Sequence, residues 1–292
     1  MNTFGNKFRV SILGESHGPV TGVVIDGVTP GLPLSADDFR ADIDRRRPGA
    51  AGTTARREAD IPEIVSGLYN GHASGAPLTI LFRNMNARPE DYVGMSPRPG
   101  HADLTAAARF KGFNDPRGGG QFSGRLTLPL VAAGVVAKKM LPFSFSSEIR
   151  ELGGSAERGT WAGLVEQALE EGDSLGAVVE CRIEGVPAGL GEPFWDSVES
   201  LLAHAVFAIP GVRGIEFGMG FGAAAVKGSA HRDTSGIAGG ISSGDPVCFR
   251  VAFKPTSSTP KAGVSGRHDA CFALRTPVIV EAVAAIVFAN LI

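Results

Sequence analysis

Short segments that place a histidine beside a carboxylate or an arginine are the residues most able to do chemistry. Residues 14–18 read Gly-Glu-Ser-His-Gly, residues 98–103 read Arg-Pro-Gly-His-Ala-Asp, and residues 266–271 read Gly-Arg-His-Asp-Ala-Cys. Imidazole changes its charge near neutral pH, and a carboxylate can act as a proton acceptor. Each segment also contains glycine, which is typical of turns that expose polar side chains. His17, His101 and Asp269 are therefore candidates for proton transfer.

A purely structural role is open for each of these side chains. Ser16 and His17 could satisfy the backbone of a turn that follows the apolar run 8–13. His101 could cap a helix predicted over residues 104–111. Asp269 could form a turn ion pair with Arg267, which could instead lower the pKa of that carboxyl or contact an anion.

Other segments have the composition of anion-binding sites. Arginines at positions 45–47, 56 and 57 form a dense cationic patch, which could also be a solvated helix end. Residues 117–125 form a glycine loop that leads into a predicted helix. Residues 239–244, Gly-Gly-Ile-Ser-Ser-Gly, are a second segment rich in glycine and serine. Residues 254–258 set a lysine beside three hydroxyl groups. Loop amides and hydroxyls bind phosphate, so these segments suggest a phosphorylated cofactor.

Composition excludes several other classes of protein. The net charge of −2 gives no reason to expect nucleic acid or an anionic membrane as partner. Cys181, Cys248 and Cys271 are widely spaced, which favours a reducing cytoplasm over a disulfide scaffold, and no histidine pair has metal-ligand spacing. The N-terminus lacks the apolar run of a signal peptide, and the apolar segment 277–292 is too short to span a bilayer.

Helices and strands that would position these residues alternate along the chain. Apolar periodicity and capping residues predict helices over 35–46, 104–111, 127–141, 193–207 and 277–291. Apolar runs predict strands over 77–82, 176–183 and 247–253. No Gly-x-Gly-x-x-Gly follows the first strand, so a Rossmann domain is disfavoured. The candidate site residues are scattered and no linker is evident, so we expect one domain over residues 1–292.

Taken in order, these segments resemble the chorismate synthase family over nearly the whole chain. Residues 14–18 with Asp26-Gly27 and Pro30-Gly31 resemble its N-terminal signature, and Ser123-Gly124-Arg125 with Thr127, Val131 and Gly134 resembles its central one. Arg267-His268-Asp269 resembles its C-terminal signature. Residues 45–49, 98–103, 239–244 and 254–258 also match in order.

The resemblance implies an α+β fold, a β-α-β sandwich that assembles as a homotetramer. It implies a lyase that converts 5-enolpyruvylshikimate 3-phosphate to chorismate by anti-1,4-elimination of phosphate, the last common step of aromatic amino acid biosynthesis in the shikimate pathway. Reduced FMN is required although the reaction has no net redox change, because electron donation from the flavin can help phosphate leave. NADPH is a possible reductant for that flavin.

The resemblance also implies roles for individual residues. His17 and His101 would be the acid histidines, one assisting phosphate and the other keeping the flavin protonated, with the assignment between them open. Asp269 would take a proton relayed through the flavin N5, and Arg46 would bind the substrate or a pyridine nucleotide. The expected flavin site consists of Gln121, Phe122, Ser123, Pro210, Gly211, Gly239, Lys254, Pro255, Thr256, Ser257, Ser258 and Arg267.

The chain departs from the family pattern at several positions. Gln121 stands where arginine is usual, Ala270 replaces a usual proline, and residues 50–52 lack an expected arginine. The segments after Leu141 and after Ser258 are shorter than in typical members. These departures concern the residues expected to determine how tightly FMN binds and whether a nicotinamide nucleotide can reduce the flavin. Two other functions therefore stay open: a flavin- or polyanion-binding homologue without catalytic activity, and an NAD(P)H-dependent flavin reductase.

Overall fold

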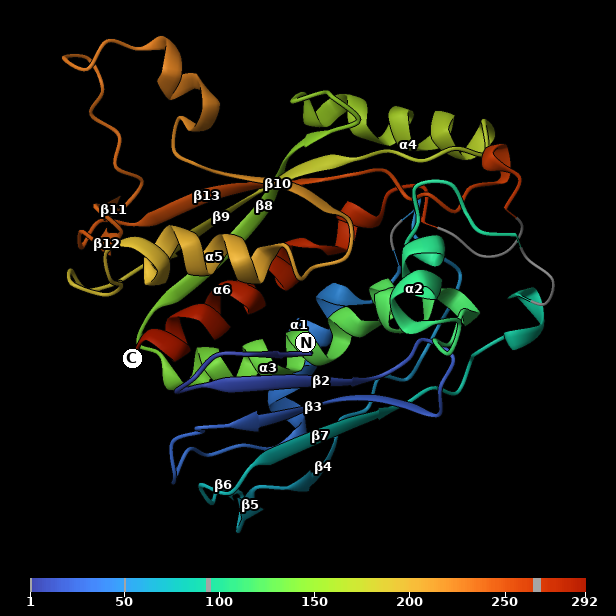
Figure 1. Ribbon diagram of the computed structural model, residues 1–292, viewed down its shortest axis with the longest axis horizontal. Coiled ribbons are helices and arrows are strands. Elements are labelled where there is room, and N and C mark those ends of the chain that lie inside the picture. Colours follow the sequence, from blue (N-terminus) through green and yellow to red (C-terminus); the bar gives the residue numbers. More distant parts are fainter. Residues whose placement is uncertain (1, 50, 93–95, 265–268) are drawn as a thin grey trace.

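Two antiparallel sheets lie on either side of a layer of helices in the computed structural model of the chain (Figure 1). The structure describes residues 2–49, 51–92, 96–264 and 269–292. The first sheet has the order β1-β2-β3-β7-β4 and consists of β1 (Thr3–Phe4), β2 (Arg9–Gly14), β3 (Val20–Asp26), β7 (Leu78–Arg83) and β4 (Glu63–Ser66). The second has the order β10-β13-β9-β8 and consists of β10 (Val212–Phe217), β13 (Val247–Phe253), β9 (Ala177–Glu184) and β8 (Ser144–Leu152).

Two short hairpins and six α-helices accompany the sheets in the described parts of the chain. Two short hairpins pair β5 (Leu68–Tyr69) with β6 (His72–Ala73) and β11 (Ile237–Ala238) with β12 (Ile241–Ser242). The α-helices are α1 (Arg40–Arg46), α2 (Asp103–Phe110), α3 (Thr127–Met140), α4 (Trp161–Glu170), α5 (Val198–Val206) and α6 (Pro277–Leu291).

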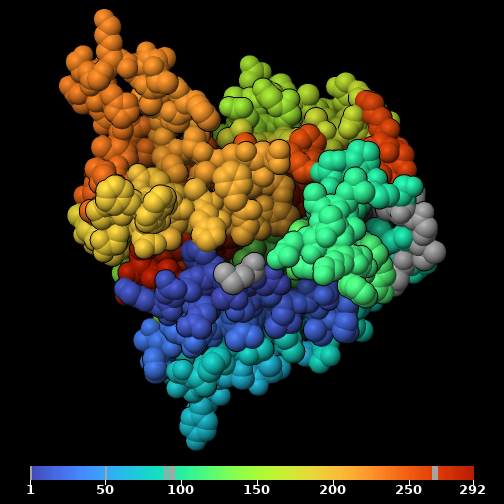
Figure 2. Space-filling model, viewed as in Figure 1, coloured from blue at the N-terminus to red at the C-terminus, as the bar shows by residue number. Residues whose placement is uncertain are grey.

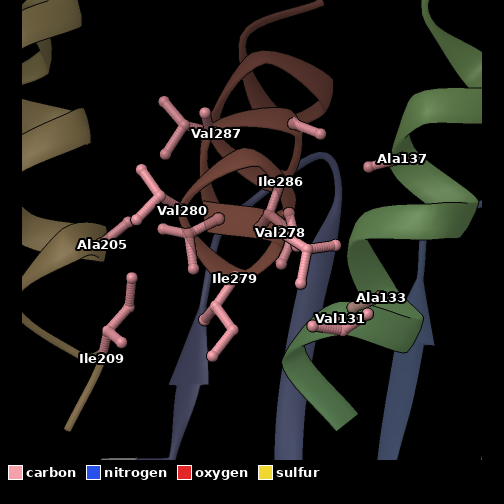
Figure 3. Packing of buried hydrophobic residues seen from close by; sticks show 14 of the residues in the cluster. Val131, Ala133, Ala137, Ala205, Ile209, Val278, Ile279, Val280, Ile286 and Val287 are labelled. Atoms are coloured by element: carbon pink, nitrogen blue, oxygen red, sulfur yellow. The ribbon is translucent and has the colours of Figure 1, made fainter. Parts of the chain in front are cut away.

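The central layer is built on the close approach of α3 and α6. A side chain at Gly134 of α3 would lie 2.3 Å from the Cβ of Ala282 in α6, so only glycine permits this crossing. α3 also packs on β3 of the first sheet, and α6 packs on β8 and β9 of the second. Figure 3 shows side chains of α6 between those of α3 and Ala205 of α5. Residues 278–289 of α6 are all buried, as expected for an apolar helix between two sheets.

One charged side chain lies inside this apolar layer. Glu281 is 2% exposed, and its carboxylate accepts hydrogen bonds from Arg45 (2.6 Å), Lys138 (2.9 Å) and the Ser147 hydroxyl (2.6 Å). Burial raises the pKa of Glu281, but the bond from Arg45 and the charge of Lys138 outweigh it and lower that pKa below its usual value. The carboxylate thereby ties α1, α3 and β8 to α6.

Most predicted elements are present, with two differences at helix starts. The helix predicted over 35–46 begins as a 3-10 turn, Ala36–Phe39, before α1, and the Ser35 N–H donates to the Asp38 carboxylate (2.7 Å). The helix predicted over 193–207 is wrong for its first residues. Phe194 has a positive φ of 69°, and the Ser197 hydroxyl accepts from the Ser200 N–H at 3.0 Å, so α5 begins only after Ser197.

An arm between β10 and β11 projects from the body of the protein. It spans residues 218–235, stands out at the upper left of Figures 1 and 2, and carries a 3-10 segment, Gly220–Ala225. The Asp233 carboxylate connects the two ends of the arm, because it accepts hydrogen bonds from the Met219 N–H (2.9 Å) and the Ser235 N–H (2.8 Å). Phe221 on the arm is 92% exposed.

Candidate active site

A cavity of about 560 Å³ collects residues from both ends and the middle of the chain. We call it the basin. Most of the residues that the sequence singled out line it: His17, Arg46, His101, Gln121, Phe122, Ser123, Pro210, Gly211, Lys254, Pro255, Thr256, Ser257, Ser258 and Asp269. Arg267 lies outside the described residues. Gly239 is described but does not line the basin.

Gly239 lies in the turn between β11 and β12, at the other end of α5 from the basin. The Val198 N–H at the start of α5 donates to Gly240 O (2.9 Å), whereas the basin is lined by residues 207–213 beyond the helix end. A helix of nine residues is about 13 Å long. The two glycine segments that resemble anion sites, 117–125 and 239–244, therefore do not share one cavity within this chain.

His17 is held at the turn that joins β2 to β3. The Asn84 side chain donates to Glu15 O (3.1 Å) and to Gly18 O (2.8 Å), which fixes both ends of the turn. Arg56 donates to the hydroxyl and to the carbonyl of Ser16, both at 3.2 Å. The Tyr92 ring meets the His17 ring edge-on, with ring centroids 4.9 Å apart. His17 as a residue is 9% exposed, so the orientation of its ring is set by protein rather than by solvent.

His101 precedes α2 and is held by charged neighbours. Its Nδ1 lies 2.6 Å from Asp103 Oδ1, and Arg98 donates to both oxygens of the same carboxylate at 2.9 Å. Ala102 is the N-cap residue of α2, so His101 does not cap the helix. Burial and the nearby Arg98 lower the pKa of His101, and Asp103 opposes that change. Burial raises the pKa of Asp103, but the bonds from Arg98 outweigh it and hold that pKa well below its usual range.

One glycine turn separates the two histidines. A side chain at Gly118 would lie 2.3 Å from Cε1 of His17, and one at Gly119 would lie 3.0 Å from Cε1 of His101. Both glycines have positive φ, 58° and 83°, which side chains adopt only with strain. The turn continues to Gly120, whose carbonyl accepts from the Ser16 N–H (3.1 Å). Residues 118–120 thus give both imidazoles room on the basin wall.

Arginines form one wall of the basin around a buried aspartate. Asp60 is 4% exposed and pairs with Arg125 at 2.5 Å and with Arg46 at 3.5 Å. Burial, together with the charges of Arg275 and Arg125, lowers the pKa of Arg46, which stays protonated. The predicted cationic patch is divided: Arg46 and Arg56 line the basin, whereas Arg45 turns to Glu281.

Asp269 lies among these cations with a defined set of partners. Its Oδ2 accepts from Arg275 (2.8 Å) and its Oδ1 accepts from the Thr54 N–H (3.0 Å). The Arg275 guanidinium lies over the Phe272 ring, 4.8 Å from its centroid. The ion pair with Arg267, one of the alternatives left open by the sequence, lies outside the described residues. Arg275 was not foreseen as a partner, because no spacing rule connects residues six positions apart across a 3-10 segment. Tyr92 and Asp60 were also missed, because their partners His17 and Arg125 are far away in the sequence.

The segment 254–258 forms the side of the basin next to His101. Lys254 donates to Gly100 O (2.6 Å) and contacts the Ser257 hydroxyl (2.5 Å), while Arg98 donates to the Ser258 hydroxyl (3.1 Å). Burial and Arg213 lower the pKa of Lys254. Thr256 Oγ1 and Arg125 Nη2 are buried and have no hydrogen-bond partner among the residues that the structure describes. An unsatisfied hydroxyl and guanidinium at one cavity fit a bound group rich in oxygen acceptors, such as a phosphorylated flavin with an anionic substrate.

Metal and membrane sites are not found in the described parts of the chain. No group of histidine, cysteine, aspartate and glutamate side chains there could hold a metal ion. Nor is any helix in those parts long and apolar enough to cross a bilayer.

Comparison with known proteins gives one consistent result. The family model described as chorismate synthase matches residues 8–292. A chorismate synthase of Chitinophaga pinensis is 51% identical, with 99% of this chain and 96% of the relative covered. One of Aeropyrum pernix is 40% identical, with 100% and 92% covered. A crystal structure of a chorismate synthase has a TM-score of 0.78 at 24% identity, covering 99% of this chain and 92% of the other, which confirms the expected fold class.

Proposed function

This chain belongs to the chorismate synthase family of carbon–oxygen lyases, and we propose that its basin carries out the family reaction with His17, His101 and Asp269 as proton-handling groups. The reaction removes one hydrogen and the phosphate of 5-enolpyruvylshikimate 3-phosphate and forms a new double bond. The comparisons do not favour the inactive homologue or the flavin reductase. The observation that carries the proposal is that these three side chains line one cavity, together with arginines that can neutralise phosphate.

Reduced FMN supplies transient electron density to the substrate, and the basin has groups suited to hold it. Lys254, Thr256, Ser257 and Ser258 would bind its polar atoms, with Pro210 and Gly211 against the ring. The buried Thr256 Oγ1, which has no hydrogen-bond partner within the described parts of the chain, supports this assignment. Gln121, Phe122 and Ser123 would complete this side of the site.

We assign His101 to the flavin side and His17 to the phosphate side. His101 adjoins Gly100, whose carbonyl binds Lys254, and its neighbour Arg98 binds Ser258. His17 follows Ser16, to which Arg56 donates two hydrogen bonds. The Arg56 guanidinium therefore lies near His17 and can attract an anionic group such as phosphate. His17 would then donate a proton to the departing phosphate, and His101 would keep a proton at the edge of the flavin site.

Asp269 is assigned as the group that accepts the proton lost in the elimination. The Asp269 side chain is 11% exposed, and its carboxylate is oriented by Arg275 and the Thr54 N–H. Arg46 and Arg125 would contact the anionic substrate. The Arg125 Nη2 atom has no hydrogen-bond partner among the described residues, which supports this role. NADPH is proposed only as an external source of electrons for FMN.

A single domain, a homotetramer and a cytoplasmic location complete the proposal. One hydrophobic cluster includes residues of both sheets and of the helices between them, which supports a single domain over residues 1–292. Phe221 on the arm, with Phe194 (85% exposed) and Trp195 (86%) near Gly239, offers apolar surface for other copies. Gly239 would then approach a flavin of a neighbouring copy. Cys181, Cys248 and Cys271 are free, as suits a reducing compartment.

The test is phosphate release from 5-enolpyruvylshikimate 3-phosphate under anaerobic conditions with chemically reduced FMN. We expect turnover by the unaltered protein and a fall of about 100-fold or more in His17→Ala and in Asp269→Asn, as for loss of a general acid or base. Asp269→Asn should keep its affinity for FMN. His72→Ala, at an exposed histidine that does not line the basin, is the matched control. FMN binding without phosphate release by the unaltered protein would support the inactive homologue instead.

A further inference from the structure

The contact between His101 and Asp103 determines which ring nitrogen carries the proton. Nδ1 lies 2.6 Å from Asp103 Oδ1 and 3.1 Å from Arg98 Nη2. Arginine only donates, so Nδ1 cannot accept from Arg98 and donate to Asp103 at once. An unprotonated Nδ1 would set its lone pair against a carboxylate oxygen 2.6 Å away. The proton therefore belongs on Nδ1, directed at Asp103.

The carboxylate is itself fixed by bonds that do not involve the histidine. The backbone N–H and the guanidinium of Arg98 both donate to it, each at 2.9 Å. Arg98 is 8% exposed and is held in turn by Ser258. Asp103 therefore has little freedom to turn away, and the imidazole ring is oriented through it.

The opposite edge of the ring is kept open. A side chain at Gly119 would lie 3.1 Å from Nε2, and His101 lines the basin. Because position 119 is glycine, nothing at that position covers Nε2. With Nδ1 committed to Asp103, Nε2 is the ring nitrogen available to exchange a proton with a bound group.

We propose that Asp103 is a positioning residue that fixes His101 in the Nδ1–H form and presents Nε2 to the basin. This inference rests on the proposed role of His101, because the benefit to catalysis comes through that imidazole. Asp103 does not line the basin, so its effect is indirect. The arrangement is the same physical device by which a carboxylate orients a catalytic or metal-binding histidine.

The charged groups around His101 determine in which direction its pKa should change when Asp103 is replaced by asparagine. Arg98 and Lys254 disfavour the imidazolium form, and Asp103 favours it. Removing the negative charge of Asp103 leaves the two cations unopposed. The pKa of His101 should therefore fall, by about one unit for the loss of one adjacent opposite charge.

The decisive measurement is 15N NMR of the flavin-free protein labelled at histidine, with the His101 signals identified by their loss in His101→Gln. In the unaltered protein we expect the neutral ring to be protonated at Nδ1, and in Asp103→Asn we expect the pKa to fall. An Nε2–H ring in the unaltered protein would overturn the inference without any variant at position 103. An unchanged pKa in folded Asp103→Asn would overturn it as well.

Turnover as a function of pH separates this inference from the proposed function. In Asp103→Asn the pH at which kcat declines on the alkaline side should be about one unit lower. Above the pKa of His101 in both proteins, kcat of the variant should be about tenfold lower than that of the unaltered protein. Below both pKa values the two rates should converge. A uniform loss at all pH values would indicate a merely structural role and would contradict the inference. If NMR shows the expected shift but the pH profile does not move, Asp103 positions the ring as inferred and the acid role of His101 fails.

Asp42→Asn is the matched control. Asp42 has a similarly buried side chain (16% exposed against 19%) and pairs with Arg45 and Lys138, but it does not line the basin or contact a histidine. It should lose stability through its ion pairs while leaving the pH profile of kcat unchanged. A shift of that profile in Asp42→Asn would show that loss of any paired carboxylate is enough, and the specific role of Asp103 would be refuted.

Discussion

The two sides of the basin hold their histidines in different ways. His17 lies in a buried turn, meets the edge of the Tyr92 ring and borders Gly118, where a side chain would clash with the imidazole. His101 is fixed mainly by charge, through Asp103 and Arg98. The same glycine turn nevertheless gives both rings their space. A change in packing should therefore act strongly at His17, and a change in charge should act strongly at His101.

The largest effect expected from this difference is at Gly118. In Gly118→Ala the new Cβ would lie 2.3 Å from Cε1 and 2.4 Å from Nδ1 of His17, so the imidazole or the turn must move. A misplaced acid loses most of its contribution, and we expect kcat to fall by about 100-fold or more. Phosphate release with reduced FMN measures the loss.

Gly112→Ala separates this clash from backbone strain. Gly112 also has a positive φ, 78°, but a side chain there would meet nothing within 4 Å. It should cost stability alone, about 1 kcal/mol for an alanine in the left-handed region. Equal loss of kcat in both variants would show that strain, and not the contact with His17, limits turnover.

The histidines could be found from the sequence, and the groups that hold them mostly could not. His17, His101 and Asp269 stand in glycine-containing segments with charged neighbours, a local pattern that the chain itself displays. Tyr92, Asp60 and Arg275 reach the site only because the two sheets pack on α3 and α6. Such contacts depend on tertiary packing, for which no spacing in the chain gives a signal.

The prediction of helices and strands from the sequence was limited in a similar way. α6 and β13 were predicted because burial imposes a continuous or alternating apolar pattern over their whole length. The start of α5 was not, because a hydroxyl cap at Ser197 and a left-handed Phe194 are decided by a few atoms. Gly239 shows the same limit at the site: its segment has the composition of an anion-binding loop, but the fold sets it beyond the other end of α5.

Gly119→Ala should have a smaller effect than Gly118→Ala. Its Cβ would lie 3.0 Å from Cε1 and 3.1 Å from Nε2 of His101, so a shift of a few tenths of an ångström relieves the contact. Asp103 opposes a larger displacement of the ring. We expect kcat to fall by about tenfold, which is less than the roughly 100-fold expected when a catalytic group is misplaced by about 1 Å. A loss as large as that of Gly118→Ala would contradict the idea that charge, rather than packing, holds His101.

The smallest effect concerns folding stability, and its sign follows from the pKa of His101. Burial, with Arg98, lowers that pKa in the folded state below the ordinary value of 6.5. Between the two values the unfolded chain binds more protons, so the free energy of unfolding falls as the pH drops through this interval. Above pH 6.5 the contribution is fully present, and the carboxyl of Asp103 does not titrate in this range because its pKa is far lower.

His101→Gln removes this dependence while keeping a polar side chain beside Asp103. Between pH 7.5 and pH 5.5 the Tm of the unaltered protein should therefore fall further than that of the variant, by about 1–2 °C for a contribution below 1 kcal/mol. Differential scanning calorimetry of both proteins across this range measures the difference. Parallel Tm curves would mean that the charges around His101 balance in the folded state. The contrast with His17 would then rest on the orientation of the His101 ring alone.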